Sequence, residues 1–297
     1  MGEYEIVSKI NCTCGECPMW DEKAQRFLWS DILAGKVYCL DAQSGAASLL
    51  ASNKNVSGFA LNTGGGLACA THQGVFLWSR ETGWSVLETQ FEGTPLKCND
   101  AIADEKGRFI FGTNYYNESN PDYMRGKIYS MDQDRTIRIL AEGFGIANGF
   151  GFSPDHRTLY FSDSAARHIY AFDYDVETGN ATNQRVCVKI PDTEGIPDGM
   201  TVDSEGYIWS ALWYGYGVAR YDPSGVLERK ISIPSGQTSS VMFGGADLTD
   251  IYITSACKVN RLKIAPSGYD FSAPHNGYTY KVNVGIQGMP EFAANLA

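Results

Sequence analysis

Six places in the sequence share a pair of residues five positions apart, in which a polar or small residue precedes a residue typical of turns. The pairs are Glu16 and Asp21, Ser57 and Asn62, Asn99 and Asp104, Asn148 and Ser153, Asp198 and Asp203, and Ser240 and Gly245. Two of the first members, Glu16 and Asp198, are carboxylates, and two more are amides. Hard oxygen donors of this kind favour Ca²⁺, Mg²⁺ or Mn²⁺, with Zn²⁺ and Fe²⁺ as further candidates.

So few protein ligands would leave coordination positions open for water and substrate, which is typical of a catalytic metal rather than a structural one. On spacing alone, an equally good interpretation is that these polar side chains cap strand ends and bind water in a channel.

A second set of residues lies fifteen positions beyond the first members: Asp31, His72, Asn114, Asp163, Trp213 and Ser255. We expect this set to form a wider ring on the same face. Trp213 is then a candidate for stacking on the ring of a bound ligand and His72 for orienting that ligand. Asp163 is expected to anchor a turn, and most other aromatic residues near this face are expected to pack between blades.

The elements that must position these residues are short β-strands. Runs such as RFLWSDI, RFIFGT and TLYFSDS recur along the chain, and each precedes a second β-rich run, with a period of about 40 to 50 residues that is typical of propeller blades. Within each pair the sequence is mostly small or apolar, as an innermost strand requires. We therefore predict one domain over residues 1–297, an all-β, six-bladed β-propeller of four-stranded antiparallel blades. The opening residues EYEIVSKI should complete the last blade and close the ring.

Composition limits the partners. The 297 residues carry 24 Lys and Arg against 34 Asp and Glu, a net charge of −10, and no basic stripe suits nucleic acid. No apolar run approaches the roughly 18 residues of a membrane span, and the N-terminus lacks an apolar signal-like stretch. We expect a cytoplasmic protein, a monomer or weak homodimer, without a nucleic-acid or membrane partner. The eight cysteines should be reduced; Cys12, Cys14 and Cys17 lack a second ligand pair, so packing is favoured over a soft-metal site.

Five segments, taken in order, resemble the signatures of the gluconolactonase and regucalcin family, also called the senescence-marker-protein family. They are GECPMW, KCNDAIADEKGRFIFGT, ANGFGFSPDHRTLYFSDS, IPDGMTVDSEGYIWSA and FGGADLTDIYITSA, within about residues 10 to 257. The resemblance implies a six-bladed propeller with one divalent cation, most readily Ca²⁺, held by Glu16, Asn148 and Asp198. It further implies that the cation polarises a lactone carbonyl while Asp198 acts as general base on water. Because a metal-bound carboxylate is a weak base, hydroxide on the cation is the alternative nucleophile.

The same resemblance assigns substrate-binding residues. Asn99 matches a family asparagine that contacts the metal or the substrate, Lys97 stands where relatives have arginine, and Asn117 falls where some carry a glutamate. Together with Trp213 and His72, they predict a hydrolase acting on the ester bond of a sugar-acid lactone, such as gluconolactone. The alternatives are an organophosphate or ester hydrolase on the same metal site and a non-catalytic calcium-binding propeller.

Overall fold

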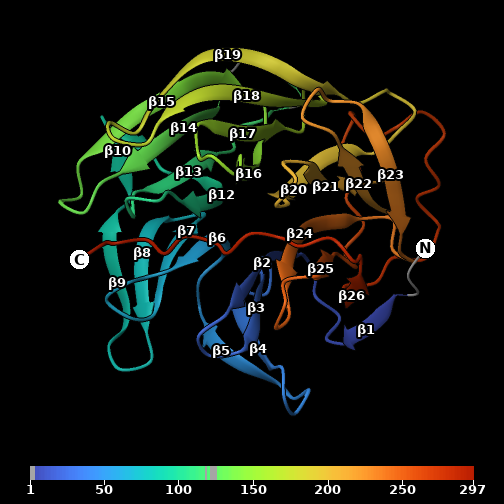
Figure 1. Ribbon diagram of the computed structural model, residues 1–297, viewed down its shortest axis with the longest axis horizontal. Coiled ribbons are helices and arrows are strands. Elements are labelled where there is room, and N and C mark those ends of the chain that lie inside the picture. The colour runs from blue at the N-terminus through green and yellow to red at the C-terminus, as the bar shows by residue number, and fades with distance from the viewer. Residues whose placement is uncertain (1–3, 118, 121–125) are drawn as a thin grey trace.

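A computed structural model describes residues 4–117, 119–120 and 126–297. In this part the chain forms six four-stranded antiparallel sheets and a short hairpin of β10 (Gln90–Phe91) and β11 (Thr94–Pro95). Figure 1 shows the six sheets arranged around a common centre. The predicted all-β, six-bladed propeller is confirmed. No helix long and apolar enough to cross a membrane occurs among the described residues.

The strands of each blade are given from the channel outward. The first three blades consist of β2 (Gly15–Asp21), β3 (Arg26–Asp31), β4 (Lys36–Asp41) and β5 (Ala47–Ser52); β6 (Val56–Leu61), β7 (Leu67–Thr71), β8 (Gly74–Ser79) and β9 (Gly83–Glu88); and β12 (Cys98–Ala103), β13 (Phe109–Thr113), β14 (Gly126–Met131) and β15 (Ile137–Phe144). The last three consist of β16 (Ala147–Phe152), β17 (Thr158–Asp163), β18 (His168–Asp175) and β19 (Asn180–Lys189); β20 (Ile196–Val202), β21 (Ile208–Trp213), β22 (Gly217–Tyr221) and β23 (Leu227–Ser232); and β24 (Thr238–Gly244), β25 (Asp250–Ser255), β26 (Thr279–Asn283) and β1 (Glu5–Ser8).

The N-terminal strand closes the ring. β1 is the outermost strand of the sixth blade and pairs antiparallel with β26, with Glu5 opposite Lys281 and Ile6 opposite Tyr280. The predicted closure is therefore confirmed. It joins the two ends of the repeat and covers an edge of β26 that would otherwise be unpaired.

The turn residues of the six pairs end the innermost strands. Asp203 accepts hydrogen bonds from the backbone N–H groups of Glu205 and Tyr207 through Oδ1, and from Arg220 and the Trp209 indole through Oδ2. Asp104 binds the turn after β12 in the same way. Carboxylates at these positions stabilise tight turns by pairing N–H groups that lack strand partners.

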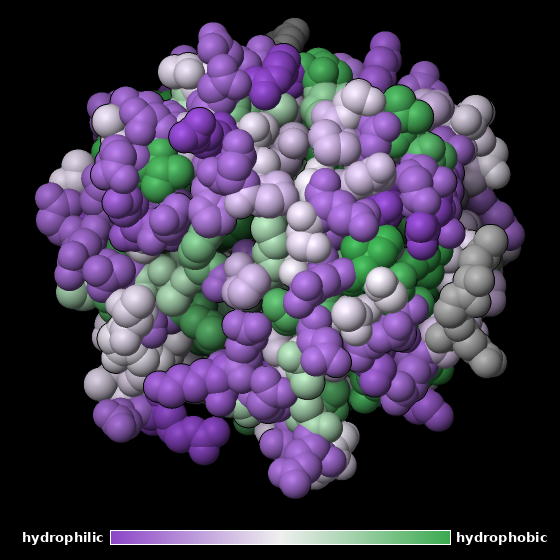
Figure 2. Space-filling view, viewed as in Figure 1, coloured by the Kyte–Doolittle hydropathy of each residue, from purple (hydrophilic) through white to green (hydrophobic). Residues whose placement is uncertain are grey.

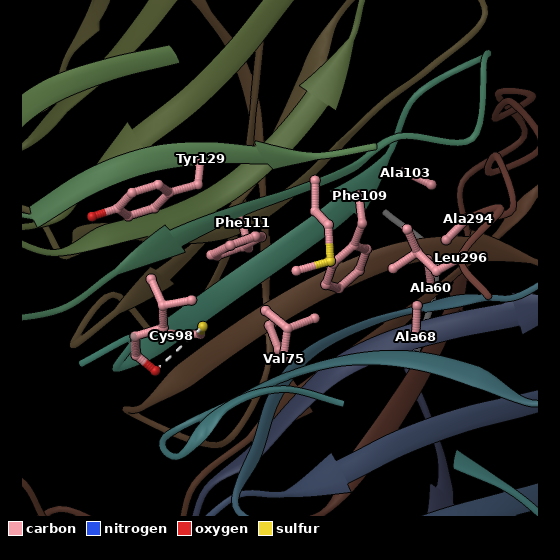
Figure 3. Packing of buried hydrophobic residues seen from close by; sticks show 13 residues of the cluster. Ala60, Ala68, Val75, Cys98, Ala103, Phe109, Phe111, Tyr129, Ala294 and Leu296 are labelled. Carbon is pink, nitrogen blue, oxygen red and sulfur yellow. Dashed lines mark hydrogen bonds between the residues drawn. The ribbon is translucent and has the colours of Figure 1, made fainter. Parts of the chain in front are cut away.

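The hydrophobic core lies between neighbouring blades. Figure 3 shows the cluster between the second and third blades, where Val75, Phe109 and Phe111 pack together, with the Phe111 and Tyr129 rings stacked at 5.4 Å. Leu296, from the segment that follows β26, joins the same cluster. Burial of these side chains supplies the main free energy that holds the blades together.

The segment after β26 crosses the end of the channel at which the innermost strands finish, and Figure 1 shows it running over the centre of the ring. Ser204 donates to the Gln287 carbonyl, Ala294 donates to the carbonyl of Leu61, and Asn295 donates to Gly107. Figure 2, drawn from the same direction, shows mostly hydrophilic residues with smaller apolar areas between them. The opposite end of the channel, where the innermost strands begin, holds the predicted site residues.

Candidate metal centre

The first members of the six pairs lie at the second or third position of the innermost strands. They are Glu16 in β2, Ser57 in β6, Asn99 in β12, Asn148 in β16, Asp198 in β20 and Ser240 in β24. The structure thus places them near the start of each innermost strand, as the repeat predicts. Ser240 is offset by one residue, because Ser239 donates to the Gly15 carbonyl in the way that Ser57 donates to the Cys98 carbonyl. We call this set the inner ring.

A β-bulge occurs at the inner-ring position of all six innermost strands. The strand register shifts between Glu16 and Met19, Val56 and Gly58, Cys98 and Asp100, Asn148 and Phe150, Pro197 and Met200, and Thr238 and Ser240. A bulge bends a strand and re-aims the side chains beside it. In β2 the bulge gives Cys17 a φ of 50°, a value that non-glycine residues seldom adopt. The sequence analysis did not predict these bulges.

The innermost strands pack so closely that glycine is required beside two inner-ring residues. A Cβ atom on Gly149 would lie 2.3 Å from the carbonyl oxygen of Asp198, and one on Gly199 would lie 2.0 Å from Ser240 Oγ. These glycines explain the small residues that follow the ring positions in the sequence. They also bring the side chains of adjacent blades together.

A cavity of about 230 Å³ opens at this end of the channel, and four inner-ring residues line it: Glu16, Asn99, Asn148 and Asp198. The two serines of the ring do not. Ser57 is buried and donates to the Cys98 carbonyl at 2.9 Å, while Ser240 lines a smaller cavity deeper in the channel. The inner ring is therefore asymmetric, because its carboxylates and amides line the cavity and its serines do not.

Only Asn114 and Trp213 of the predicted wider ring line the cavity. The expectation of a complete second ring is corrected, because Asp31 and Asp163 are buried and Ser255 donates to the carbonyls of Asn276 and Tyr278. The carboxylates of Asp31 and Asp163 instead accept hydrogen bonds from backbone N–H groups.

These two carboxylates act as anchors. Asp31 accepts from the N–H groups of Thr13 at 2.8 Å and Cys14 at 3.1 Å, and Asp163 accepts from Gly145 at 3.0 Å and Ile146 at 3.1 Å. Each thus fixes the segment just before a cavity-lining residue of the ring, Glu16 in one blade and Asn148 in the other. The predicted turn-anchoring role of Asp163 is confirmed.

The substrate-binding candidates are divided. Lys97, Asn99 and Trp213 line the cavity, but His72 and the exposed Asn117 do not. Burial lowers the pKa of His72, and the Lys97 charge lowers it further, which places the two side chains near each other. The insertion after β13 contributes Asn114 and Tyr116 to the cavity, and its residues 118 and 121–125 lie outside the described part.

Three buried carboxyl groups lie at the centre of the channel. Burial raises the pKa of Glu16 well above its usual range, and the Asp198 and Asp100 charges raise it further. Burial also raises the pKa of Asp198, again with a contribution from Asp100. Burial raises the pKa of Asp100 to about 7. Backbone N–H groups lower these pKa values, but no basic side chain does so among the described residues, so positive charge does not compensate the desolvation of the carboxyl groups.

Comparison with known proteins places this site in a family. The SMP-30/Gluconolactonase/LRE-like region matches residues 14–257. The chain belongs to this family. A pentonolactonase of Haloferax volcanii is 32% identical over 294 residues, which cover 98% of this chain and 97% of the relative.

Solved structures agree with the fold of this SMP-30/gluconolactonase/LRE-like member. A luciferin-regenerating enzyme has a TM-score of 0.90 at 25% identity, covering 100% of both chains. A calcium-binding protein, the regucalcin of Agrobacterium tumefaciens, has a TM-score of 0.84 at 25% identity, covering 98% of this chain and 97% of the other.

The donor set of this family member fits a hard divalent cation. Glu16 and Asp198 present carboxylate oxygens, Asn148 presents an amide, and the uncompensated carboxyl groups call for positive charge. The described residues contain no cluster of three or more His, Cys, Asp or Glu side chains that could hold a metal ion.

The cysteines beside Glu16 are thiols. All eight cysteines are free, as predicted. Burial raises the pKa of Cys14 well above its usual range, and the charges of Glu16 and Asp198 add to this effect. Cys14 lines the cavity beside Glu16.

One wall of the cavity was missed by the sequence analysis. Asn260 and Leu262 come from residues 256–278, between β25 and β26, outside the repeat. The buried Gln237 donates to the Lys258 carbonyl and accepts from the Asn260 N–H, both at 2.7 Å. The sequence feature that could have revealed this wall is the long connection between β25 and β26.

Proposed function

We propose that this protein is a metal-dependent lactonase that opens a single-ring sugar-acid lactone to the free acid. The observation that carries the proposal is the convergence of two carboxylates and two amides of the inner ring on one cavity, while the other two ring residues point elsewhere. Its relative named pentonolactonase and its structural neighbour described as a calcium-binding protein support the reaction and the cation.

Glu16, Asn148 and Asp198 would hold the cation, with Ca²⁺ as the first choice because all three donors are hard oxygens. When bound, a divalent cation supplies Lewis-acid polarisation of the lactone carbonyl. Asp198, only 6% exposed and on the cavity wall, accepts the proton of the attacking water. The same proton can pass to the ring oxygen as the ester C–O bond breaks, so that the products are an alcohol and a carboxylic acid.

The shape and lining of the cavity suit a small hydroxylated ring. Its volume of about 230 Å³ lies below the roughly 300 Å³ at which pockets for drug-sized ligands begin. Lys97, Asn99 and Asn114 offer hydrogen bonds to hydroxyl groups, and Ile146 and Ile196 offer an apolar wall for the C–H face of a sugar. Lys97 is exposed and lines the cavity, so its ammonium group can reach a bound ligand.

The test is proton release from a panel of aldono- and uronolactones. Metal-stripped protein receives Ca²⁺, Mn²⁺, Zn²⁺, Mg²⁺ or Fe²⁺ singly, and Asp198→Asn serves as the matched inactive control. Hydrolysis above the spontaneous rate that requires a cation supports the proposal. Cleavage of phosphate or simple carboxylic esters alone would favour the ester-hydrolase alternative, and cation binding without any turnover would favour a binding propeller.

We further propose that the protein works as a monomer or weak homodimer in the cytoplasm, on a small molecule and without a nucleic-acid or membrane partner. The net charge of −10 supports the exclusion of nucleic acid. Sedimentation velocity over a range of protein concentrations checks the oligomeric state, and a stable tetramer would contradict it.

A further inference from the structure

Ser164 connects two blades at the wall of the cavity. It follows β17, is 2% exposed and lines the cavity beside Asn148. Asn148 Nδ2 donates to Ser164 Oγ at 2.8 Å, and Ser164 Oγ donates to the carbonyl oxygen of Pro197 at 2.6 Å. Pro197 immediately precedes Asp198, so one hydroxyl group lies between two of the proposed cation ligands.

The chemistry of these partners fixes the direction of both hydrogen bonds. A backbone carbonyl can only accept a hydrogen bond, so the Ser164 hydroxyl group must donate its single hydrogen to the carbonyl oxygen of Pro197. Its lone pairs then face Asn148, which has to present its NH₂ group. The amide oxygen of Asn148 is thereby turned away from Ser164.

The other side of the Asn148 amide has the same polarity. Asn99 Nδ2 donates to Asn148 Oδ1 at 2.6 Å and to the Ala147 carbonyl at 2.7 Å. Asn99 donates to the amide oxygen of Asn148, and Ser164 accepts from its NH₂ group. A flip of the Asn148 amide would break both hydrogen bonds. An amide oxygen has two lone pairs, so Oδ1 keeps one for a ligand in the cavity while accepting from Asn99.

We propose that Ser164 is a positioning residue that holds the amide oxygen of Asn148 toward the cation and ties it to the strand that carries Asp198. This inference rests on the proposed function. Without the Ser164 hydroxyl, the Asn148 amide can turn its NH₂ group toward the cation, where it repels positive charge. Partners of this kind, behind the ligands, commonly change metal affinity by about 10- to 100-fold.

The chain provides a matched control in the same blade, two residues before Ser164. Ser162 is fully buried, like Ser164, but its hydroxyl has no hydrogen-bond partner in the described part of the chain. Ser162 stands opposite Asn148 in the pairing of β16 with β17, so Ser162→Ala removes a hydroxyl group equally near Asn148 without breaking a side-chain hydrogen bond.

The experiment measures Mn²⁺ binding to metal-stripped protein by calorimetry, with circular dichroism as a check of folding. We expect Ser164→Ala to raise the Kd about 10- to 100-fold, Ser164→Thr to restore it to near the wild-type value, and Ser162→Ala to leave it unchanged. If Ser164→Ala does not fold, Ser164→Cys, a weaker acceptor of similar size, should raise the Kd in its place.

Mn²⁺ affinity within twofold of wild type in a folded Ser164→Ala or Ser164→Cys protein would overturn the inference and leave the proposed function standing. Equal weakening by Ser162→Ala would also overturn it. Failure of the wild-type chain to bind any divalent cation would remove the proposed function itself, and the inference with it.

Discussion

At the scale of single residues, the site is defined by what its carboxylates lack. Glu16 and Asp198 are desolvated at the centre of the channel, where burial raises the pKa of both and one backbone N–H group lowers each. Structural carboxylates elsewhere in the molecule are satisfied by several donors, as Asp203 is by Arg220 and Trp209. This contrast separates carboxylates that await a ligand from those that hold the fold.

Asp198→Asn tests the assigned role of Asp198 as proton acceptor. The substitution keeps the size of the side chain but removes the base and one negative charge, so lactone hydrolysis should fall by at least about 100-fold. The measurement is initial rate at saturating cation, with thermal melting as the control for folding. A folded Asp198→Asn protein with near wild-type turnover would contradict the role.

At the scale of elements, bulges and buried anchors aim the site residues. Asp163 collects the N–H groups of Gly145 and Ile146 before β16, and the bulge after Asn148 turns the strand. Both devices act on the same short segment and together fix the direction of the Asn148 side chain.

Asp163→Ala should lower the free energy of unfolding by about 1–3 kcal/mol, because it leaves buried N–H groups without acceptors. It should also weaken cation binding, since Asn148 follows the released segment. Asp192→Ala is the matched control, because that aspartate side chain is 97% exposed. Urea denaturation measures the free energy of unfolding of both variants. Equal values for Asp163→Ala and Asp192→Ala would contradict the anchoring role of Asp163.

The sequence was informative where the repeat is regular. The spacing of residues such as Glu16 and Asp198 placed six innermost strands and their ring, because each strand obeys the same packing rule around one axis. It could not reveal the bulges, since Cys17 has a positive φ without being glycine. It also missed Asn260 and Ser164, whose positions depend on contacts between blades and on a connection outside the repeat.

At the scale of the whole molecule, the two ends of the described chain have different tasks. The N-terminal strand β1 closes the ring at its rim, whereas the segment after β26 covers the far end of the channel. The cavity with the proposed cation site therefore opens at one end only.

Ile6→Pro tests the closure. Proline cannot donate a backbone hydrogen bond in β1, so the pairing with Tyr280 should weaken and stability should fall by about 1–3 kcal/mol. Ile6→Thr keeps a strand-favouring residue at the same position and should change stability much less. Guanidinium denaturation compares them, and equal midpoints for the two variants would contradict closure by β1.

Glu291, at the closed end of the channel, should make the stability of the folded protein depend on pH. Its side chain lines a small cavity with Met19 and Met242, and burial raises its pKa from 4.5 to about 7. The unfolded chain loses this proton near pH 4.5, but the folded chain keeps it to about pH 7, so folding becomes less favourable across that window.

Glu291→Gln removes this penalty. The melting temperature of Glu291→Gln minus that of wild type should increase between pH 4.5 and about 7 and then level off. The exposed Glu81→Gln variant should show no such trend. A constant difference for Glu291→Gln across the range would mean that its carboxyl group is solvated in the folded protein.

The most direct test of the central claim is a titration of metal-stripped protein with Mn²⁺ while lactone hydrolysis is followed by proton release. Activity should rise in proportion to added Mn²⁺ and stop increasing at one equivalent per chain, and Asp198→Asn should stay inactive throughout. Hydrolysis that is already complete without cation, or one equivalent bound with no turnover of any lactone, would contradict the account.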